Sequence, residues 1–164
     1  MADVILDTNI ILDYLSATRE QHVEAVNVLE QLLESDVYEP VILAAGIKDA
    51  YYILCRHFGG KREELVRERL DAFRQVVSVA ELTYDVIDRA FASNEPDLED
   101  GIVRATAELR GAAAIVTRDR GAMNSSVPSM TAKEFLQRMY KVATSWYHAA
   151  GAGEGDNHAR SRAR

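Results

Sequence analysis

The sequence predicts an α/β protein with three layers, α/β/α, in which helices cover both faces of a mainly parallel sheet of four or five strands. Short apolar, often β-branched runs alternate along the chain with longer segments whose apolar residues recur at helical spacing. Such alternation is typical of a parallel sheet built from strand–helix units. The length of 164 residues suits one domain with one core, and 48% hydrophobic and 27% charged residues are close to the globular average.

The first half of the chain contains two predicted strands and four predicted helices. A buried strand at 3–6 is interrupted by the polar triplet Asp7-Thr8-Asn9, after which a helical pattern starts at Ile10. The segment after Phe58 begins with two glycines, which should end a helix there. In chain order we expect a strand at 3–6, helices at 10–15 and 19–34, a strand at 40–43, and helices at 47–58 and 61–74.

The second half repeats this alternation and ends in a polar tail. Pro96 and Asp97 should open a helix that runs through Leu109 and is closed by Gly111. In chain order we expect a strand at 76–79, helices at 84–92 and 96–109, strands at 113–117 and 127–130, and a helix at 132–148. One domain should therefore span 1–148, and the almost complete lack of large apolar residues near the C-terminus predicts a disordered tail at 149–164.

Composition narrows the possible compartments and partners. The sequence contains no run of about 18 apolar residues that could span a membrane. The first residues include acidic ones where a secretory signal would have basic ones, so we expect a cytoplasmic protein. The single Cys55 agrees with a reducing compartment, and we expect it to be a buried small apolar residue. The formal net charge of −7 argues mildly against a nucleic-acid partner, although acids gathered at one cation site would lower the charge without excluding local basic patches.

Four isolated acids follow predicted strands. Asp7 comes directly after the first strand, Asp49 and Asp100 lie near the starts of helices, and Asp119 follows the strand at 113–117. Ligands of open parallel sheets collect outside the carboxyl ends of the strands, so these acids should share one edge. Crowded carboxylates repel one another, and divalent cations such as Mg²⁺ and Mn²⁺, which prefer oxygen ligands, relieve that repulsion. The pattern predicts a metal site.

Each acid also has a purely structural interpretation. Asp7 could be the N-cap of the helix that follows it. Asp97 and Asp100 form a D-x-x-D pattern that resembles a capping box and suits the helix dipole. Asp119 could be a turn residue, and Asp49 could be an ordinary exposed acid. Spacing alone leaves these alternatives open.

Two long motifs stand out, DTNIILDYL at 7–15 and DLEDGIVRATAELRGAAAIVTRD at 97–119. The first resembles the opening motif of the PIN-domain family, in particular of the VapC ribonuclease toxins of bacterial toxin–antitoxin pairs, and the second resembles that family's third motif together with the strand that ends in the fourth. The family's last strand and helix resemble VPSMTAKEFL at 127–136. Together the likeness covers roughly residues 3–140.

The resemblance implies a cytoplasmic, Mg²⁺- or Mn²⁺-dependent endoribonuclease. Asp7, Asp100 and Asp119 match the first, third and fourth acids of the family. The second acid is usually a Glu early in the helix after the second strand, and here Asp49 is the candidate. The resemblance also implies an RNA substrate, an antitoxin protein and a homodimer. Further residues match supporting positions that orient or flank the acids: Thr8, Asn9, Asp97 and Thr117, with Asp97 favoured as a helix cap and Glu99 beside it.

Cations near these acids could contact RNA phosphates, or could equally be solvated or paired with local acids; they are Lys48, Arg104, Arg118 and Arg120. Apolar residues of the N-terminal helices could belong either to an interface or to the core; they are Tyr14, Leu15, Val23 and Val26.

Two other classes of protein compete with the nuclease. A non-catalytic PIN-like module that binds RNA or protein would suit the acidic charge and the Asp at position 49. A phosphoacceptor receiver domain also has acids at strand ends, but it requires a Lys after a late strand and adjacent acids after the first strand, and this sequence fits that pattern poorly.

Overall fold

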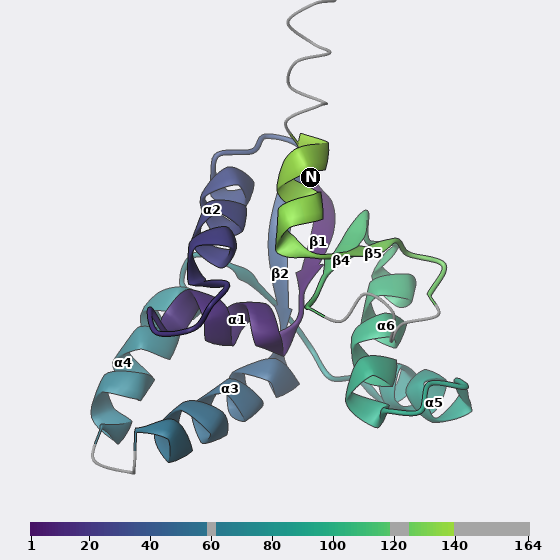
Figure 1. The fold of residues 1–164 in the computed structure, drawn as a ribbon. Helices are drawn as coiled ribbons and strands as arrows, with labels where there is room; N and C mark the ends of the chain where they lie inside the picture. Colours follow the sequence, from purple (N-terminus) through teal and green to yellow (C-terminus); the bar gives the residue numbers. More distant parts are fainter. Residues whose placement is uncertain (59–61, 119–124, 140–164) are drawn as a thin grey trace, which may run out of the picture.

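The computed structural model describes residues 1–58, 62–118 and 125–139, and its helices flank one central sheet (Figure 1). The elements in chain order are β1 (Ala2–Leu6), α1 (Thr8–Leu15), α2 (His22–Leu33), β2 (Tyr38–Leu43), α3 (Ala44–His57), α4 (Glu63–Arg74), β3 (Ser78–Ala80), α5 (Tyr84–Ala92), α6 (Leu98–Arg110), β4 (Ala114–Val116) and β5 (Ser129–Met130). Residues 132–139 form a further helix.

The sheet has five parallel strands in the order β3-β2-β1-β4-β5. The first strand in the sequence lies in the centre, where Leu6 pairs in register with Ile42 of β2 on one side and Val116 of β4 on the other. The predicted α/β class with a mainly parallel sheet of four or five strands is thereby confirmed. All strands end at the same edge, so every segment that follows a strand starts there.

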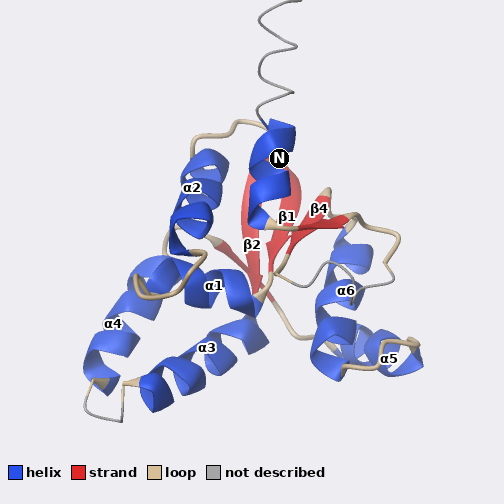
Figure 2. Ribbon diagram, viewed as in Figure 1, coloured by secondary structure: helices blue, strands red, loops and turns tan. Residues whose placement is uncertain are grey.

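Alternate residues of each central strand enter different cores, as the period of two in a strand requires. In β1, Val4 and Leu6 pack in the larger core under α1 to α4 and the helix at 132–139, whereas Ile5 packs in the smaller core under α6. In β4, Val116 packs in the larger core and Ile115 in the smaller core. Both faces of the sheet are covered by helices (Figure 2), which explains why β4 and the buried ends of β1 and β2 are continuously apolar.

Several element boundaries differ from the prediction. The third strand lies at Ser78–Ala80 rather than 76–79, and α1 and α3 begin two or three residues earlier than their apolar patterns suggested. α2 begins at His22 rather than at 19, because residues 19–21 form a turn in which the backbone N–H of His22 donates to the carbonyl of Arg19. The predicted stop of α6 is correct, since Gly111 has the left-handed φ of 62° that glycine adopts without strain.

Some predictions fall outside the described residues. These are the Gly59-Gly60 break, the end of the last helix beyond residue 139, the tail at 149–164, and residues Asp119 and Arg120. Cys55 is half-buried rather than buried. Within the described ranges, the helices are all too short or too polar to cross a membrane.

Candidate functional site

The candidate site lies at the carboxyl edge of the sheet, where β1 and β4 end side by side. Asp7 follows β1 and Thr117 follows β4, and the backbone N–H of Asp7 donates to the carbonyl of Val116 over 3.0 Å. The Thr117 hydroxyl donates to Oδ2 of Asp7 over 2.8 Å. Asp7 is 5% exposed and Thr117 is 1% exposed. Residues 110 positions apart in sequence thus hold one carboxylate in a defined orientation at the end of the central strand.

The alternative interpretation of Asp7 as a capping side chain does not describe this arrangement. Asp7 does occupy the N-cap position of α1, with an extended backbone (φ −65°, ψ 155°). Among the described residues, however, its side chain makes no capping hydrogen bond to that helix. A buried carboxylate oriented by a distant strand, rather than by its own helix, is suited to binding a ligand.

Asp49 lies in the second turn of α3 and forms an ion pair with its neighbour. The Nζ of Lys48 is 2.7 Å from Oδ1 of Asp49, whose side chain is 29% exposed. The hydrogen bond with Asp49, and after it the negative charge of Asp49, raises the pKa of the Lys48 ammonium. The acid predicted to replace the family's Glu is therefore half-buried in the second turn of α3 and paired with a lysine.

Glu99, at the start of α6, is close enough to both acids to sense their charge. Desolvation raises the pKa of its carboxyl, and the negative charges of Asp49 and Asp7 raise it further. A hydrogen bond with the side chain of Thr8 acts in the opposite direction. The structure thus brings Asp7, Asp49 and Glu99 close enough to interact electrostatically. Glu99 was expected from the sequence only as a neighbour of the predicted ligands.

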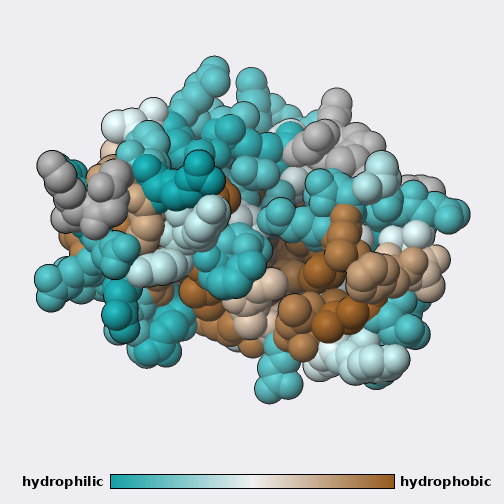
Figure 3. All heavy atoms as spheres, turned by 90° about the horizontal axis from the view of Figure 1, so that it is seen from below, coloured by the Kyte–Doolittle hydropathy of each residue, from teal (hydrophilic) through white to brown (hydrophobic). Residues whose placement is uncertain are grey.

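The three elements that carry these acids enclose a small pocket. Asp49 and Glu99 line it together with Thr8, Leu82 and Ile102, and its volume is about 290 Å³. Figure 3 shows the face from below, the side towards which β1 runs in Figure 1, where apolar side chains border hydrophilic ones. Polar groups at the edge of a largely apolar pocket are typical of ligand sites.

Gly46 allows α3 to approach α1 at this pocket. A Cβ placed on Gly46 would lie 3.1 Å from the Thr8 Oγ1 and 3.5 Å from the Ile11 Cδ1. The first distance is tighter than ordinary van der Waals contact, so the position favours glycine. Thr8 itself is buried, at 7% exposure, and its hydroxyl lies between the glycine and Glu99.

The remaining predicted residues occupy different places. Asp97 is the N-cap of α6, and its carboxylate accepts a hydrogen bond from the backbone N–H of Glu99 over 2.8 Å, as its preferred reading as a cap predicted. Asp100 is half-buried in the first turn of α6, and Asn9 is half-buried in the first turn of α1. Asp119 lies outside the described residues, two positions after Thr117.

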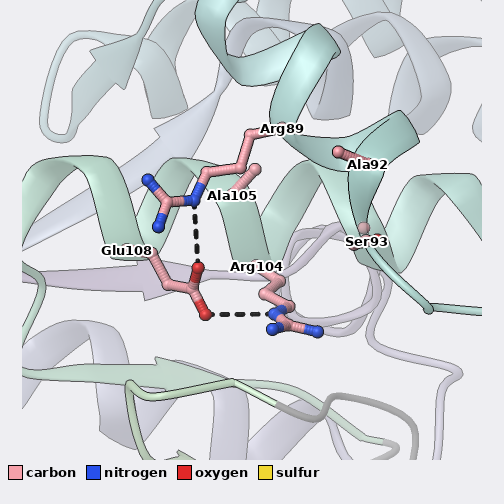
Figure 4. A pocket seen from close by; sticks show the side chains of 7 residues that line it. Arg89, Ala92, Ser93, Arg104, Ala105 and Glu108 are labelled. Carbon is pink, nitrogen blue, oxygen red and sulfur yellow. Dashed lines mark hydrogen bonds and ion pairs between the residues drawn. The ribbon is translucent and has the colours of Figure 1, made fainter.

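The cations near the acids are mostly paired. Figure 4 shows Arg104 and Arg89 on either side of Glu108, and the Nε of Arg104 is 3.0 Å from Oε1 of Glu108. Arg104 also pairs with Glu95 over 2.9 Å. Of the two readings left open for Arg104, pairing with local acids is therefore the one that the structure shows. Arg118 instead donates two hydrogen bonds to Asp13.

Asp13 was not singled out from the sequence. It lies on α1 with a side chain that is 0% exposed, and it accepts hydrogen bonds from Arg118 and from the Nε of Arg19 over 2.6 Å. One signal was available, because a charged residue within an otherwise apolar run at 10–15 should be buried and paired. Its partners could not be named, since one of them is 105 residues away.

The donors at this edge are chemically suited to a hard divalent cation, because they are carboxylates that repel one another. Their arrangement is more open than a finished site. Within residues 1–58, 62–118 and 125–139, no three acidic, His or Cys side chains lie close enough to enclose an ion. Lys48 contacts Oδ1 of Asp49 and would compete with a cation for that carboxylate, whereas Asp7 is already oriented by Thr117.

Comparison with known proteins agrees with this architecture. Residues 3–121 match the model of a PIN domain, so the chain belongs to the PIN-domain family. No curated protein sequence matches it.

Solved structures of toxin–antitoxin proteins have a similar fold. VapBC2 from Rickettsia felis, bound to a DNA fragment from its promoter, matches with a TM-score of 0.59 and 14% identity over 79% of this chain and 98% of that one. VapC20 of Mycobacterium tuberculosis, described as a toxin that cleaves the sarcin–ricin loop, matches with a TM-score of 0.56 and 15% identity over 68% and 86%. A toxin–antitoxin complex from Klebsiella pneumoniae matches with a TM-score of 0.58 and 20% identity over 79% and 97%. The fold is VapC-like.

Proposed function

We propose that this chain is a metal-dependent endoribonuclease and the toxin of a type II toxin–antitoxin pair. The observation that carries the proposal is the buried Asp7 carboxylate, which Thr117 orients at the end of the central strand and which lies near enough to Glu99 to raise its pKa. PIN-domain membership and the VapC-like fold support the same function. The antitoxin partner and a homodimer are parts of this proposal.

The residues that would hold the ion are Asp7, Asp49, Asp100 and Asp119, with Glu99 beside them. Bound Mg²⁺ or Mn²⁺ would supply Lewis-acid activation of water and neutralise charge at the scissile phosphate. Thr117 keeps the Asp7 carboxylate fixed, so that its orientation need not be established when substrate arrives. Lys48 neutralises Asp49 until a ligand takes its place.

The products distinguish this mechanism from one that uses the RNA itself as nucleophile. Attack by water leaves a 5′-phosphate and a 3′-hydroxyl, whereas attack by the 2′-hydroxyl leaves a cyclic phosphate and requires an acid–base pair, typically His. The test is to incubate purified protein, free of antitoxin, with structured RNA and Mg²⁺ or Mn²⁺ and to analyse the ends. Cyclic phosphate ends, or cleavage that survives EDTA, would refute the proposal.

A non-catalytic PIN-like module is a second candidate, because the Lys48–Asp49 ion pair occupies one of the predicted ligands. In that case Mn²⁺ titration should show no binding by calorimetry, and Asp7→Asn should leave RNA or protein binding unchanged.

A further inference from the structure

Among the residues that the structure describes, Lys48 and Arg104 near the candidate site are each paired with acids. Beside the site, two arginines contact one buried acid. Asp13 is fully buried, and its carboxylate accepts hydrogen bonds from Arg19 and Arg118 over 2.6–2.7 Å. The side chains of Arg19 and Arg118 are 29% and 31% exposed. The buried carboxylate thus holds two guanidinium groups whose outer parts reach solvent.

This cluster carries one more positive charge than negative. Arg118 donates hydrogen bonds to the Asp13 carboxylate from its Nε and one terminal nitrogen, and Arg19 donates one from its Nε. In the part of the chain that the structure describes, neither guanidinium pairs with a second carboxylate. A single arginine would neutralise Asp13, so the second contributes charge and hydrogen-bond donors that the fold does not consume. Guanidinium donors of this kind suit the oxygens of a phosphate.

The backbone around the pair is fixed before any ligand binds. The N–H of Arg19 donates to the carbonyl of Ser16 over 3.0 Å, and its own carbonyl accepts from His22. The Nδ1 of His22 lies 2.8 Å from the carbonyl oxygen of Asp13, so the turn at 16–22 is tied to α1. A preorganised cation pair loses little side-chain entropy on binding, which favours affinity.

The pair lies next to the candidate metal edge. Arg118 directly follows Thr117, whose hydroxyl contacts Asp7. Asp13 is six residues after Asp7, about 9 Å along the helix at 1.5 Å per residue. One segment of single-stranded RNA is long enough to contact both places.

We propose that Arg19 and Arg118, held by Asp13, bind a phosphate group of the RNA backbone beside the cleavage site. The inference rests on the proposed ribonuclease function and names a substrate subsite for it. An acidic protein segment is the other possible ligand for such a pair, and the experiment separates the two. RNA is the occupant that we favour, because a chain of net charge −7 needs local cations at the place where a polyanion approaches its acids.

The test measures binding without cleavage. Fluorescence anisotropy with an unstructured RNA oligonucleotide in EDTA, repeated over a range of KCl concentrations, gives the affinity and its salt dependence. Arg19→Gln should weaken binding about three- to tenfold and reduce the slope of log K against log salt by about 0.7, the value for one phosphate contact on a single strand. Arg110→Gln is the matched control, because Arg110 also pairs with one aspartate, Asp3, but at the opposite edge of the sheet.

A second measurement needs no variant. RNA should protect Arg19 of the unaltered protein from modification by phenylglyoxal, as read by mass spectrometry, whereas Arg110 should stay reactive.

Each outcome decides a different statement. The subsite would be overturned if the protein binds RNA but Arg19→Gln has the affinity and salt slope of the parent, and RNA protects Arg19 no more than Arg110. That result would leave the nuclease function intact. Arg19-dependent binding of polyglutamate, with RNA binding independent of Arg19, would assign the pair to an acidic protein instead. A protein that neither binds nor cleaves RNA would contradict the proposed function itself.

Discussion

The hydroxyl of Thr117 donates to Oδ2 of Asp7 across the junction of β1 and β4, and both side chains are almost fully buried. Thr117→Val keeps the shape of the side chain and removes the donor. Because a buried carboxylate would lose a partner, the free energy of unfolding should fall by about 1.5–3 kcal/mol. Urea unfolding at neutral pH measures it.

The control for this variant is Thr106→Val. Thr106 is equally buried, and its hydroxyl donates to the backbone carbonyl of Ile102 within the same helix, so its loss should cost about 1 kcal/mol or less. Equal costs for the two variants would show that the charge of Asp7 adds nothing to its contact with Thr117.

Replacement of Lys48 should affect metal binding in the direction opposite to replacement of Asp49. Lys48→Gln removes the competitor of a cation for Asp49, and because an exposed ion pair is weak, Mn²⁺ affinity should rise by no more than about fivefold. Asp49→Ala should abolish nuclease activity with little change in melting temperature. Calorimetry and an RNA cleavage assay measure the two effects, with Lys133→Gln, at an exposed site, as the control. Full activity of Asp49→Ala would mean that another residue, such as Glu99, supplies the ligand.

Glu99 should make stability depend on pH. Its carboxyl has a raised pKa in the folded state, so the ionised form is less favourable there than in the unfolded chain. Glu99→Gln should therefore be more stable than the parent at pH 7, by less than about 1 kcal/mol because solvent screens the site. This advantage should disappear as the pH falls below about 4.3, where the unfolded carboxyl is also protonated. Denaturant unfolding at several pH values measures it, and Glu30→Gln, an exposed acid of α2, should show no such trend. Added Mn²⁺ should reverse the order at pH 7, since the cation favours the ionised carboxylate.

Two glycines provide a test of close packing at the site. Gly101→Ala in α6 would place its Cβ no closer than 3.4 Å to its neighbours, and the gain in helix propensity should stabilise the protein by up to about 1 kcal/mol. Gly46→Ala should lack this gain, because the methyl group must displace the Thr8 hydroxyl, and its nuclease activity should fall. Thermal unfolding and RNA cleavage by both variants make the comparison. Equal stabilisation by the two substitutions would show that Thr8 moves without cost.

The buried acid on α1 should be costly to replace. Asp13→Asn would leave Arg19 and Arg118 without a charged partner, and loss of one partner of a buried pair costs about 3–5 kcal/mol. Since both guanidinium groups reach solvent, we expect the lower part of that range. Chemical unfolding of Asp13→Asn, compared with Asp88→Asn on the exposed side of α5, measures the cost.

The sequence was sufficient to predict the order of strands and helices, because period-two and helical patterns are local. It also placed Asp7 correctly at a strand end, and Asp97 at a helix cap. It did not reveal what those side chains contact. Thr117, which contacts Asp7, and Arg118, which contacts Asp13, lie more than 100 residues away in sequence, and such contacts depend on the strand order.

The boundaries of elements were the other source of difference. β3 is displaced from the β-branched run at 76–79, because pairing with β2, where Val41 faces Ser78, decides where the strand begins. The sequence predicted Asp49 as a ligand but did not predict its ion pair with Lys48. Adjacent charged residues can point toward or away from each other, and this depends on the side-chain geometry.

The central position of β1 has a consequence for synthesis on the ribosome. The strand that is made first needs β4, made more than 100 residues later, to complete its pairing. A nascent chain that has reached only α5 can pair β1 with β2 and β2 with β3, but it lacks the neighbour that orients Asp7. The candidate site of a growing polypeptide would thus stay unassembled until β4 has been made, which gives the proposed antitoxin, if it is made at the same time, an interval in which to bind first.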